Sequence, residues 1–277
     1  MEEKMKHIFT GAFVLALVFT GILNLHAADD FIIDEPNYVD LSASSAPSQS
    51  PETSPAVTRI PFIGSVPTTD NLMRGDFLSQ FSMYDNGGVN IRLLVGIFGM
   101  LSIGVSENFD GLIGADKITV NIPVAYIKFS LYEQSQWMNF SMGFDHFAYG
   151  HNGAYFDPNG ISSSIYGFYA NIGQNYYVFG EKNIFTFGIR IPLLPEGMRS
   201  MTNSTFFFGA TLNTRYLHFG ITVENIYADF TRVEHILPSF IIAFVPIPSF
   251  QLGFTLQYEF FSLSFNRVLS LGYTAKF

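Results

Sequence analysis

The segment from Phe250 to Phe277 alternates between large apolar side chains and small or polar ones. Large apolar residues take every second position from Phe250 to Tyr258 and mostly again from Leu269 to Phe277, and Gln, Gly, Thr, Ser and Lys lie between them. A period of two places successive side chains on opposite faces of a β-strand. The apolar face must then be covered either by a second sheet, as in a soluble sandwich, or by lipid, as in a membrane barrel with a polar interior.

The composition favours the barrel. Hydrophobic residues make up 48% of the 277 positions and charged residues 13%, about half the charged fraction of roughly 25% that is usual in soluble domains. Beyond the amino terminus no apolar run is long enough for a membrane-spanning helix, which needs about 18 residues or more. A soluble protein with so few charges would struggle to cover its surface, whereas a barrel with a lipid-facing exterior needs few.

The amino-terminal residues, 1–27, are predicted to be a secretory signal peptide. Lys4 and Lys6 precede an apolar run from Ile8 to Leu25, and the small residues Ala27 and Ala28 follow it, as at a signal-peptidase site. A retained membrane anchor is the alternative. The chain contains no cysteine, so neither a lipid-modified cysteine nor a disulfide framework is expected.

Residues 28–72 are predicted to form a disordered periplasmic tail and linker. The stretch begins with acidic residues, and a run rich in Ser and Pro follows from Ser42 to Pro51. Such a composition buries too little apolar surface to offset the entropy of ordering the chain. The barrel is therefore assigned to residues 73–277.

Alternating segments follow one another from about Asp76 onward. Met138 to Phe144, Phe185 to Ile191 and Leu217 to Val223 are examples in which apolar residues occupy every second position. We expect an all-β, up-and-down antiparallel transmembrane β-barrel of about 12 strands, with 10 to 14 compatible with the pattern. Three segments are less regular: 118–132, where Pro123 indicates a kink; 240–245, which is apolar on both faces; and 76–84, where Leu78 and Tyr84 fall on the polar side.

The predicted connections alternate in length. Short breaks fall near positions 99–100, 134–136, 181–182, 214–215 and 246–248, and longer ones near 110–116, 150–164, 192–203 and 228–235. Asp85 to Gly88 is a shorter turn at the same end of the predicted barrel as the longer loops. Outer-membrane barrels have short periplasmic turns and longer external loops, so this alternation favours a barrel located in the cell outer membrane.

Six charged or titratable residues fall on predicted inward faces. An inward charge is tolerated next to water or a partner but is costly in lipid. One interpretation is a network of ion pairs that plugs the barrel. The other is a set of residues that tunes the passage of solutes, with the excess of Arg and Lys favouring anions. These lumen-lining candidates are Arg92, Lys128, Arg190, His218, Glu224 and Lys276.

The final seven residues, Leu-Gly-Tyr-Thr-Ala-Lys-Phe, resemble the carboxy-terminal signal of bacterial outer-membrane barrels. The resemblance implies that Leu271, Tyr273 and Phe277 are recognised by the barrel-assembly machinery.

The stretch 87–132 also resembles uncharacterised YjbH-like outer-membrane barrels, some of which are associated with exopolysaccharide export. The likeness lies in Gly104, Asp110, Ile113-Gly114, Pro123, the run Ile127 to Tyr132, and Gly143-Phe144-Asp145. This likeness identifies no substrate.

Catalysis, metal binding and nucleic-acid binding are not expected. The phospholipase type of outer-membrane barrel resembles a twelve-stranded barrel with a His and a Ser two residues apart, but Ala148, Gly153, Gly220 and Leu237 stand at that spacing from the four histidines beyond the predicted signal peptide. The residues around Asp145 and His146 match no defined metal site. The net charge is −9 without a Lys/Arg cluster, which argues against nucleic acid as a partner.

Outer-membrane lipid is the expected partner, with a small solute or polysaccharide as the proposed cargo and no cofactor. The sequence leaves two functions open. One is a small-solute channel or a component of solute or polysaccharide export. The other is a plugged structural or adhesive barrel that acts through its external loops, with a lipid-modifying barrel enzyme as a third and weaker alternative.

Overall fold

The structure is a computed structural model that describes residues 60–114, 118–121, 123–131, 138–146, 166–193, 204–227, 236–260 and 263–276. Within these residues no helix is long and apolar enough to cross a membrane. The predicted signal peptide and residues 28–59 of the predicted tail lie outside the described residues.

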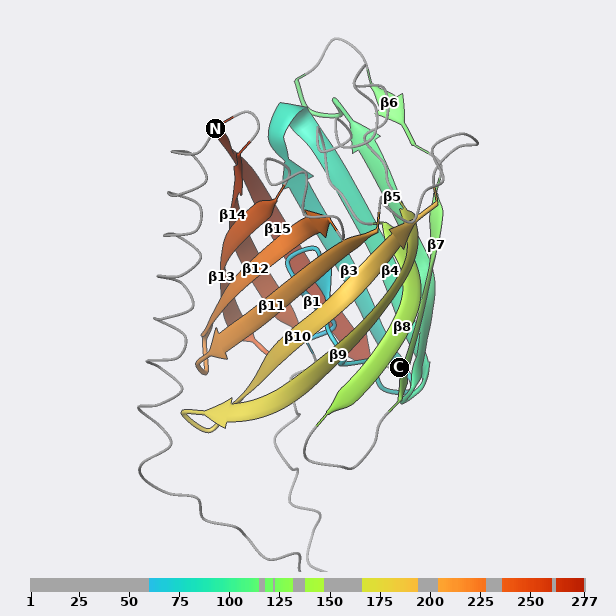
Figure 1. Ribbon diagram of the computed structural model, residues 1–277, viewed down its shortest axis with the longest axis vertical. Helices are drawn as coiled ribbons and strands as arrows, with labels where there is room; N and C mark the ends of the chain where they lie inside the picture. The colour runs from blue at the N-terminus through green and yellow to red at the C-terminus, as the bar shows by residue number, and fades with distance from the viewer. Residues whose placement is uncertain are drawn as a thin grey trace, which may run out of the picture. The chain divides into compact units, whose positions relative to one another are not determined.

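Twelve strands of the described chain form one closed antiparallel ring (Figure 1). Each strand pairs with its neighbours in the chain, and β15 pairs back onto β3, so that Leu269 lies opposite Met83 and Lys276 opposite Asp76. The strands are β3 (Asp76–Tyr84), β4 (Gly88–Phe98), β5 (Leu101–Asp110), β7 (Val124–Leu131), β8 (Asn139–His146), β9 (Tyr166–Val178), β10 (Glu181–Pro192), β11 (Thr205–Asn213), β12 (Leu217–Tyr227), β13 (Leu237–Ile247), β14 (Phe250–Glu259) and β15 (Ser264–Lys276). The predicted up-and-down barrel of about 12 strands is confirmed.

The short strand β6 (Thr119–Val120) pairs with β5, as β7 does. Asn121 to Pro123 separate β6 from β7. Proline lacks the N–H that a strand ladder requires. The irregularity predicted near Pro123 is therefore an interruption of the strand.

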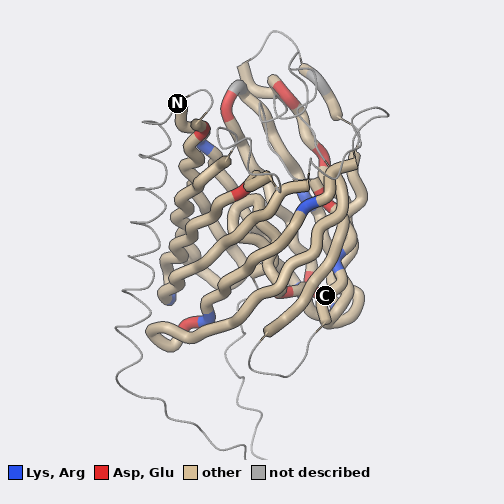
Figure 2. The backbone as a smooth tube through the Cα atoms, viewed as in Figure 1, with Lys and Arg blue, Asp and Glu red and all other residues tan. Residues whose placement is uncertain are grey.

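The alternation of the sequence becomes an apolar exterior and a polar interior. Leu252 and Phe254 of β14 and Leu269 of β15 face outward, and Leu269 is 45% exposed. The inward positions between them hold Gly253, Thr255 and other small or polar residues. A closed barrel leaves no unpaired strand edge, and an apolar outer face is stable in lipid. Figure 2 shows long stretches of the strands without a charged residue. The protein is a transmembrane β-barrel of the outer-membrane type.

The connections divide between the two ends of the barrel. Short turns at Gly99-Met100, Phe179-Gly180 and Pro248-Ser249 lie at the end where β3 begins and β15 finishes. We call this the short-turn end. At the opposite end, Asp85–Gly87 form a single turn between β3 and β4, and the other connections there are longer, except the one between β14 and β15. The short-turn end corresponds to the periplasmic side of outer-membrane barrels.

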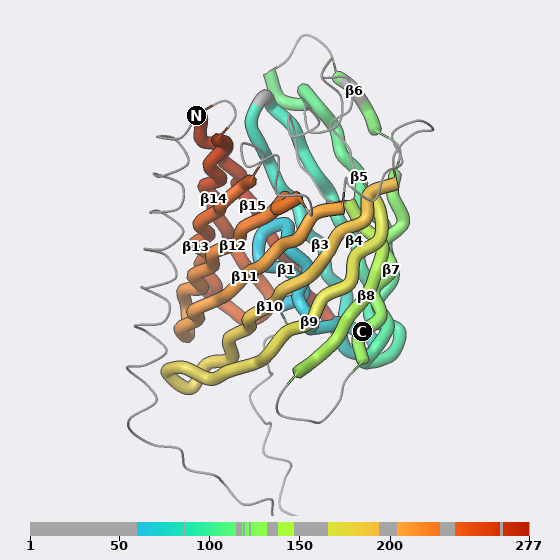
Figure 3. The backbone as a smooth tube through the Cα atoms, viewed as in Figure 1, coloured from blue at the N-terminus to red at the C-terminus, as the bar shows by residue number. Residues whose placement is uncertain are grey.

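A segment preceding β3 lies inside the barrel, which differs from the prediction for residues 28–72. Strands β1 (Phe62–Ile63) and β2 (Val66–Pro67) form an antiparallel hairpin, and Figures 1 and 3 show β1 within the ring of strands. We call residues 60–74 the lumen hairpin. The residues from Val66 to Leu72 are buried. Over residues 60–72 the predicted disordered tail is therefore corrected to a folded segment, because the barrel interior supplies the apolar and polar partners that the segment lacks by itself.

The interior has two groups of buried apolar side chains, and the hairpin takes part in both. Val66 packs with Tyr169, Phe207, Tyr227 and Leu237. A second cluster consists of Leu72, Leu78, Leu94 and Tyr126, with Phe62 packed against it. Leu78, one of the two residues that make the predicted strand 76–84 irregular, is buried and packs with Leu72 of the hairpin. The lumen is thus filled in the manner of a protein core.

Candidate functional site

The lumen hairpin reverses direction between β1 and β2. Gly64 has a φ of +61°, a backbone conformation that glycine adopts without strain. Its α-carbon lies so close to Ile241 that an added Cβ would stand 3.2 Å from the Ile241 Cδ1 atom. At the open end of the hairpin, the Thr68 amide donates to the carbonyl of Pro61 at 3.0 Å. The turn therefore fits both the local backbone and the wall that it faces.

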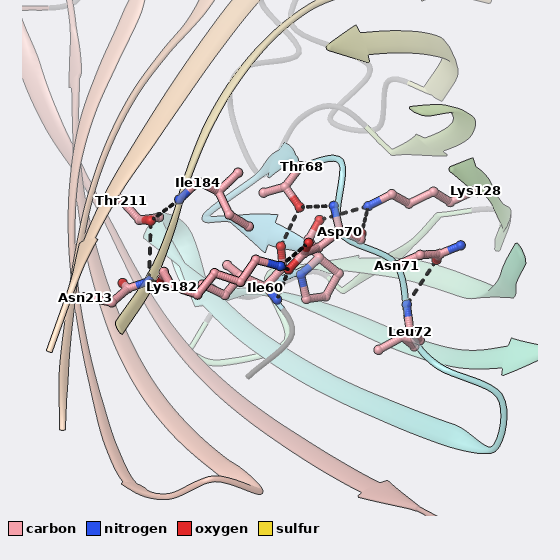
Figure 4. Close-up of polar contacts among 11 residues, drawn as sticks. Ile60, Thr68, Asp70, Asn71, Leu72, Lys128, Lys182, Ile184, Thr211 and Asn213 are labelled. Atoms are coloured by element: carbon pink, nitrogen blue, oxygen red, sulfur yellow. Dashed lines mark hydrogen bonds and ion pairs between the residues drawn. The ribbon is translucent and has the colours of Figure 1, made fainter. Parts of the chain in front are cut away.

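Asp70 forms an ion pair between the hairpin and the barrel wall. The Lys182 Nζ atom, at the start of β10, lies 2.5 and 2.7 Å from the two carboxylate oxygens of Asp70, and both side chains are buried. The Ile60 amide donates to the same carboxylate at 3.2 Å. Figure 4 shows Asp70 between Lys182 and a second lysine, Lys128 of β7. Lys128 donates through its Nζ to the backbone carbonyl of Asp70 and to that of Pro61.

A second polar contact holds the turn of the hairpin. Arg190 of β10 and Glu224 of β12 form a buried ion pair with an N–O distance of 2.5 Å. Arg190 also donates to the backbone carbonyl of Ser65 at 3.0 Å, and the Ser65 hydroxyl donates to Glu224. Lys182 lies near the short-turn end of β10 and Arg190 near its other end. The hairpin therefore extends along the lumen with both of its ends toward the short-turn end.

Neutral wall side chains bind the carbonyl groups of the hairpin. Asn171 of β9 donates to the carbonyl of Pro67 at 2.9 Å, and the Ser141 hydroxyl of β8 donates to that of Thr68 at 3.2 Å. Near the short-turn end, the Leu72 amide donates to the hydroxyl oxygen of Ser102 on β5 at 3.3 Å. A buried carbonyl without a partner is unfavourable, so these side chains replace the water that would solvate an unoccupied lumen.

The other half of the lumen is closed by side chains of the wall. Arg92 of β4 forms an ion pair with Asp145 of β8 at 3.2 Å, and its guanidinium lies 4.5 Å from the ring centre of Phe62. His146 is hydrogen-bonded through Nδ1 to the Ser106 hydroxyl at 2.9 Å. Together with Tyr126, Tyr169, Phe207 and Tyr227 these residues are buried in the interior of the barrel.

The hairpin packs unevenly against the wall. Ser141, Asn171 and Thr186 on β8 to β10 are almost fully buried beneath it. On the opposite side, the inward residues Gln80, Thr255, Ser270 and Thr274 of β3, β14 and β15 are only half-buried. Toward the long loops, Ser82, Gln257 and Val268 on the same three strands are buried again. The hairpin therefore covers the inward residues of β3, β14 and β15 less completely than those of β8 to β10.

The six predicted lumen residues occupy different places. Arg92, Lys128, Arg190 and Glu224 point inward and are buried, and the last three of these are hydrogen-bonded to the hairpin. His218 is half-buried near the short-turn end of β12, and Lys276 is exposed at the end of β15. The structure thus brings the first four to the filled lumen and leaves the last two at the rim. Their role in solute passage stays a prediction.

Sequence reasoning did not single out Asp70, Lys182 or Asp145 as lumen residues. Lys182 lies in phase with the inward residues Thr186 and Arg190. Extending the alternation of β10 by two inward positions before Thr186 would therefore have identified it. Asp145 lies in phase with Ser141, but its neighbour His146 directs attention to a metal rather than to an ion pair. The described residues contain no group of three potential metal ligands. Asp70 lies in a segment without periodicity, and no signal indicated it.

Two residues of the predicted assembly signal have the expected orientation. Leu271 and Tyr273 are on the outer face of β15, and both are exposed. Phe277 lies outside the described residues. Recognition of these residues by the assembly machinery remains a prediction.

Comparison with known proteins gives structural neighbours only. No family model matches the chain, and no curated protein matches it, so the YjbH-like resemblance stays an expectation. Among solved structures, the KdgM porin has a TM-score of 0.45 and 10% identity over 72% of this chain and 98% of its own. Omp33 of Acinetobacter baumannii has a TM-score of 0.41 and 9% identity over 73% and 97% of the two chains, and the NanC porin 0.41 and 10% over 73% and 99%.

Proposed function

We propose that the protein is a gated channel for small polar solutes in the outer membrane, with the lumen hairpin as its gate. The observation that carries the proposal is the polar attachment of this hairpin inside the barrel. The ion pair between Asp70 and Lys182 holds it, together with hydrogen bonds to both neutral and charged wall side chains. We propose no enzymatic activity for the protein.

The chemistry of the wall supports a lumen that is hydrated during part of the functional cycle. Four wall cations and two wall anions are buried around the hairpin: Arg92, Lys128, Lys182, Arg190, Asp145 and Glu224. A permanently dry interior is usually as stable or more stable with apolar residues in place of buried ion pairs. Charged and amide side chains suit a surface that water contacts whenever the hairpin leaves.

A gate of this kind fits a small solute better than a polymer. The inward residues of β3, β14 and β15 beside the hairpin are only half-buried, so a limited displacement of the hairpin would expose them to a small solute. A polysaccharide chain would require the whole hairpin to leave the lumen. The more specific expectation of polysaccharide export is therefore not part of the proposal.

The second candidate function is a permanently closed structural or adhesive barrel. The observation in its favour is the aromatic cluster beyond the hairpin, in which Tyr169, Phe207 and Tyr227 are almost fully buried. These side chains would obstruct the lumen even after the hairpin moved, unless they changed rotamer. The two functions make opposite predictions for conductance.

An engineered disulfide tests the gate. In the variant Asn71→Cys/Ser102→Cys, the new thiols replace side chains that are in direct contact between the hairpin and β5. Because the natural chain has no cysteine, the disulfide is the only one that forms. We expect wild-type protein in planar bilayers to show defined current steps, the oxidised variant to be silent, and a reducing agent to restore the steps.

Two controls accompany this measurement. Each single cysteine variant should conduct in both redox states, and unheated samples should keep the gel mobility of a folded barrel. Equal currents from the oxidised and reduced double variant would show that the hairpin is not the gate. An absence of defined steps from every form, including the wild type, would favour the permanently closed barrel.

A further inference from the structure

Resting on the proposed gate function, we infer that Lys182 and Lys128 form an anion site in the lumen, and that the solute which occupies it carries a carboxylate. In the closed channel the carboxylate of Asp70 occupies this site. Both ammonium groups contact the same residue, Lys182 through the carboxylate and Lys128 through the backbone carbonyl (Figure 4). The hairpin thus presents to the wall the group that the solute would present.

The distribution of charge in the wall separates these two lysines from the arginines. Arg92 pairs with Asp145, and Arg190 pairs with Glu224, so both arginines are neutralised by residues of the barrel itself. The ammonium groups of Lys128 and Lys182 instead make the hairpin contacts described above. When the hairpin withdraws, these contacts are lost and the arginine pairs remain. Among the buried wall residues that the structure describes, four cations then face two anions.

The hairpin carries only one acidic side chain. Between positions 60 and 75, Asp70 is the only Asp or Glu, and the other contacts of the hairpin with wall side chains are made mainly by its backbone and by neutral groups. Lys182 binds both oxygens of the Asp70 carboxylate. A small organic acid presents the same pair of oxygens in the same geometry, and charge-assisted hydrogen bonds are stronger than neutral ones.

Two side chains of β11 beside Lys182 are neutral and hydrogen-bonding. Asn213 of β11 donates to the backbone carbonyl of Lys182 at 2.7 Å, and Thr211 of the same strand lies beside Asn213 (Figure 4). Neither side chain adds a negative charge that would repel an anion. The surroundings suit an organic acid that also carries hydroxyl groups.

Competition for this site connects the solute to the gate. A carboxylate that binds Lys182 cannot do so while Asp70 is bound, so it binds the withdrawn state preferentially. A ligand with such a preference shifts the equilibrium toward that state. The solute would therefore open the channel through which it passes.

A buried reporter residue measures the withdrawn state without any current. Thr69 lies in the hairpin, is almost fully buried and packs against Gly173 of β9. In the full-length Thr69→Cys variant, a water-soluble maleimide reacts with the thiol only when the hairpin has left the lumen. Sodium acetate is the probe, and sodium chloride at equal concentration is the control. Acetate at about ten times its dissociation constant should raise the labelling rate about tenfold, whereas chloride should change it little.

The charge of the site is tested by a second substitution. Adding Lys182→Gln to the Thr69→Cys variant should raise the basal labelling rate and remove the response to acetate. Equal responses to acetate and chloride would overturn the preference for a carboxylate, and a full acetate response without Lys182 would overturn the anion site. This readout is independent of conductance. An acetate response in a protein that never conducts would leave the site standing and refute the channel. Gating by the engineered disulfide without an acetate response would support the channel and refute the anion site.

Discussion

Replacing Asp70 with Asn removes the charge that joins the hairpin to the wall and keeps the size of the side chain. The pair with Lys182 is buried, with side-chain exposures of 1% and 7%. Removing one member of such a pair costs about 3–5 kcal/mol when the other remains buried. The lower end applies here, since the amide oxygen of Asn still accepts a hydrogen bond. The ion pair exists only while the hairpin is seated in the lumen. The substitution therefore destabilises the seated state relative to the withdrawn one.

A shift of about 3 kcal/mol corresponds to a population change of about 10²-fold. We expect Asp70→Asn to raise the open probability in planar bilayers by this factor, and to raise the maleimide labelling rate equally when it is combined with Thr69→Cys. Lys182→Gln should act in the same direction. The double variant Asp70→Asn/Lys182→Gln should show much less than the sum of the two effects, because both substitutions break the same pair. If Asp70→Asn left both the open probability and the labelling rate unchanged, the proposed role of this ion pair would be refuted.

Three further changes test other parts of the structure. Asp145→Asn breaks the wall pair with Arg92 and should lower the free energy of unfolding by about 3 kcal/mol, measured from the unfolding midpoint in urea. It should have little effect on the labelling of the hairpin, and an increase in labelling comparable to that of Asp70→Asn would contradict this expectation. Gly96→Ala places a Cβ 1.9 Å from the Met73 carbonyl oxygen, whereas the same change at Gly272 meets nothing closer than 3.7 Å. Gly96→Ala should therefore destabilise by about 1–3 kcal/mol and Gly272→Ala by much less, as measured by the temperature at which folded gel mobility is lost. Leu269→Arg puts a charge on the outer face and should cost about 2–4 kcal/mol at the depth of the bilayer centre; unchanged stability in lipid vesicles would argue that this face does not contact lipid.

The alternation of residues determined the barrel, because the pleat of a strand fixes the face of each side chain locally. Leu269 and Ser270 lie on opposite faces of the sheet whatever the rest of the chain does, and the low charge content and the loop lengths indicated which face is outward. The same rule gave the inward positions of Arg92 and Arg190. Inward and outward faces, and the closed sheet they require, were therefore readable from neighbouring positions alone.

The contents of the lumen were decided only by the tertiary structure. The segment from Ile60 to Leu72 mixes apolar, Pro, Gly and Thr residues without a period, so by itself it has no preferred face to bury. Its partners are distant in the sequence: Lys182 is 112 positions from Asp70, and Arg190 is 125 from Ser65. Closure of the ring brings these groups to one place, and the resulting polar interior makes burial of the hairpin favourable. A local pattern cannot encode a contact whose two sides meet only after the sheet has closed.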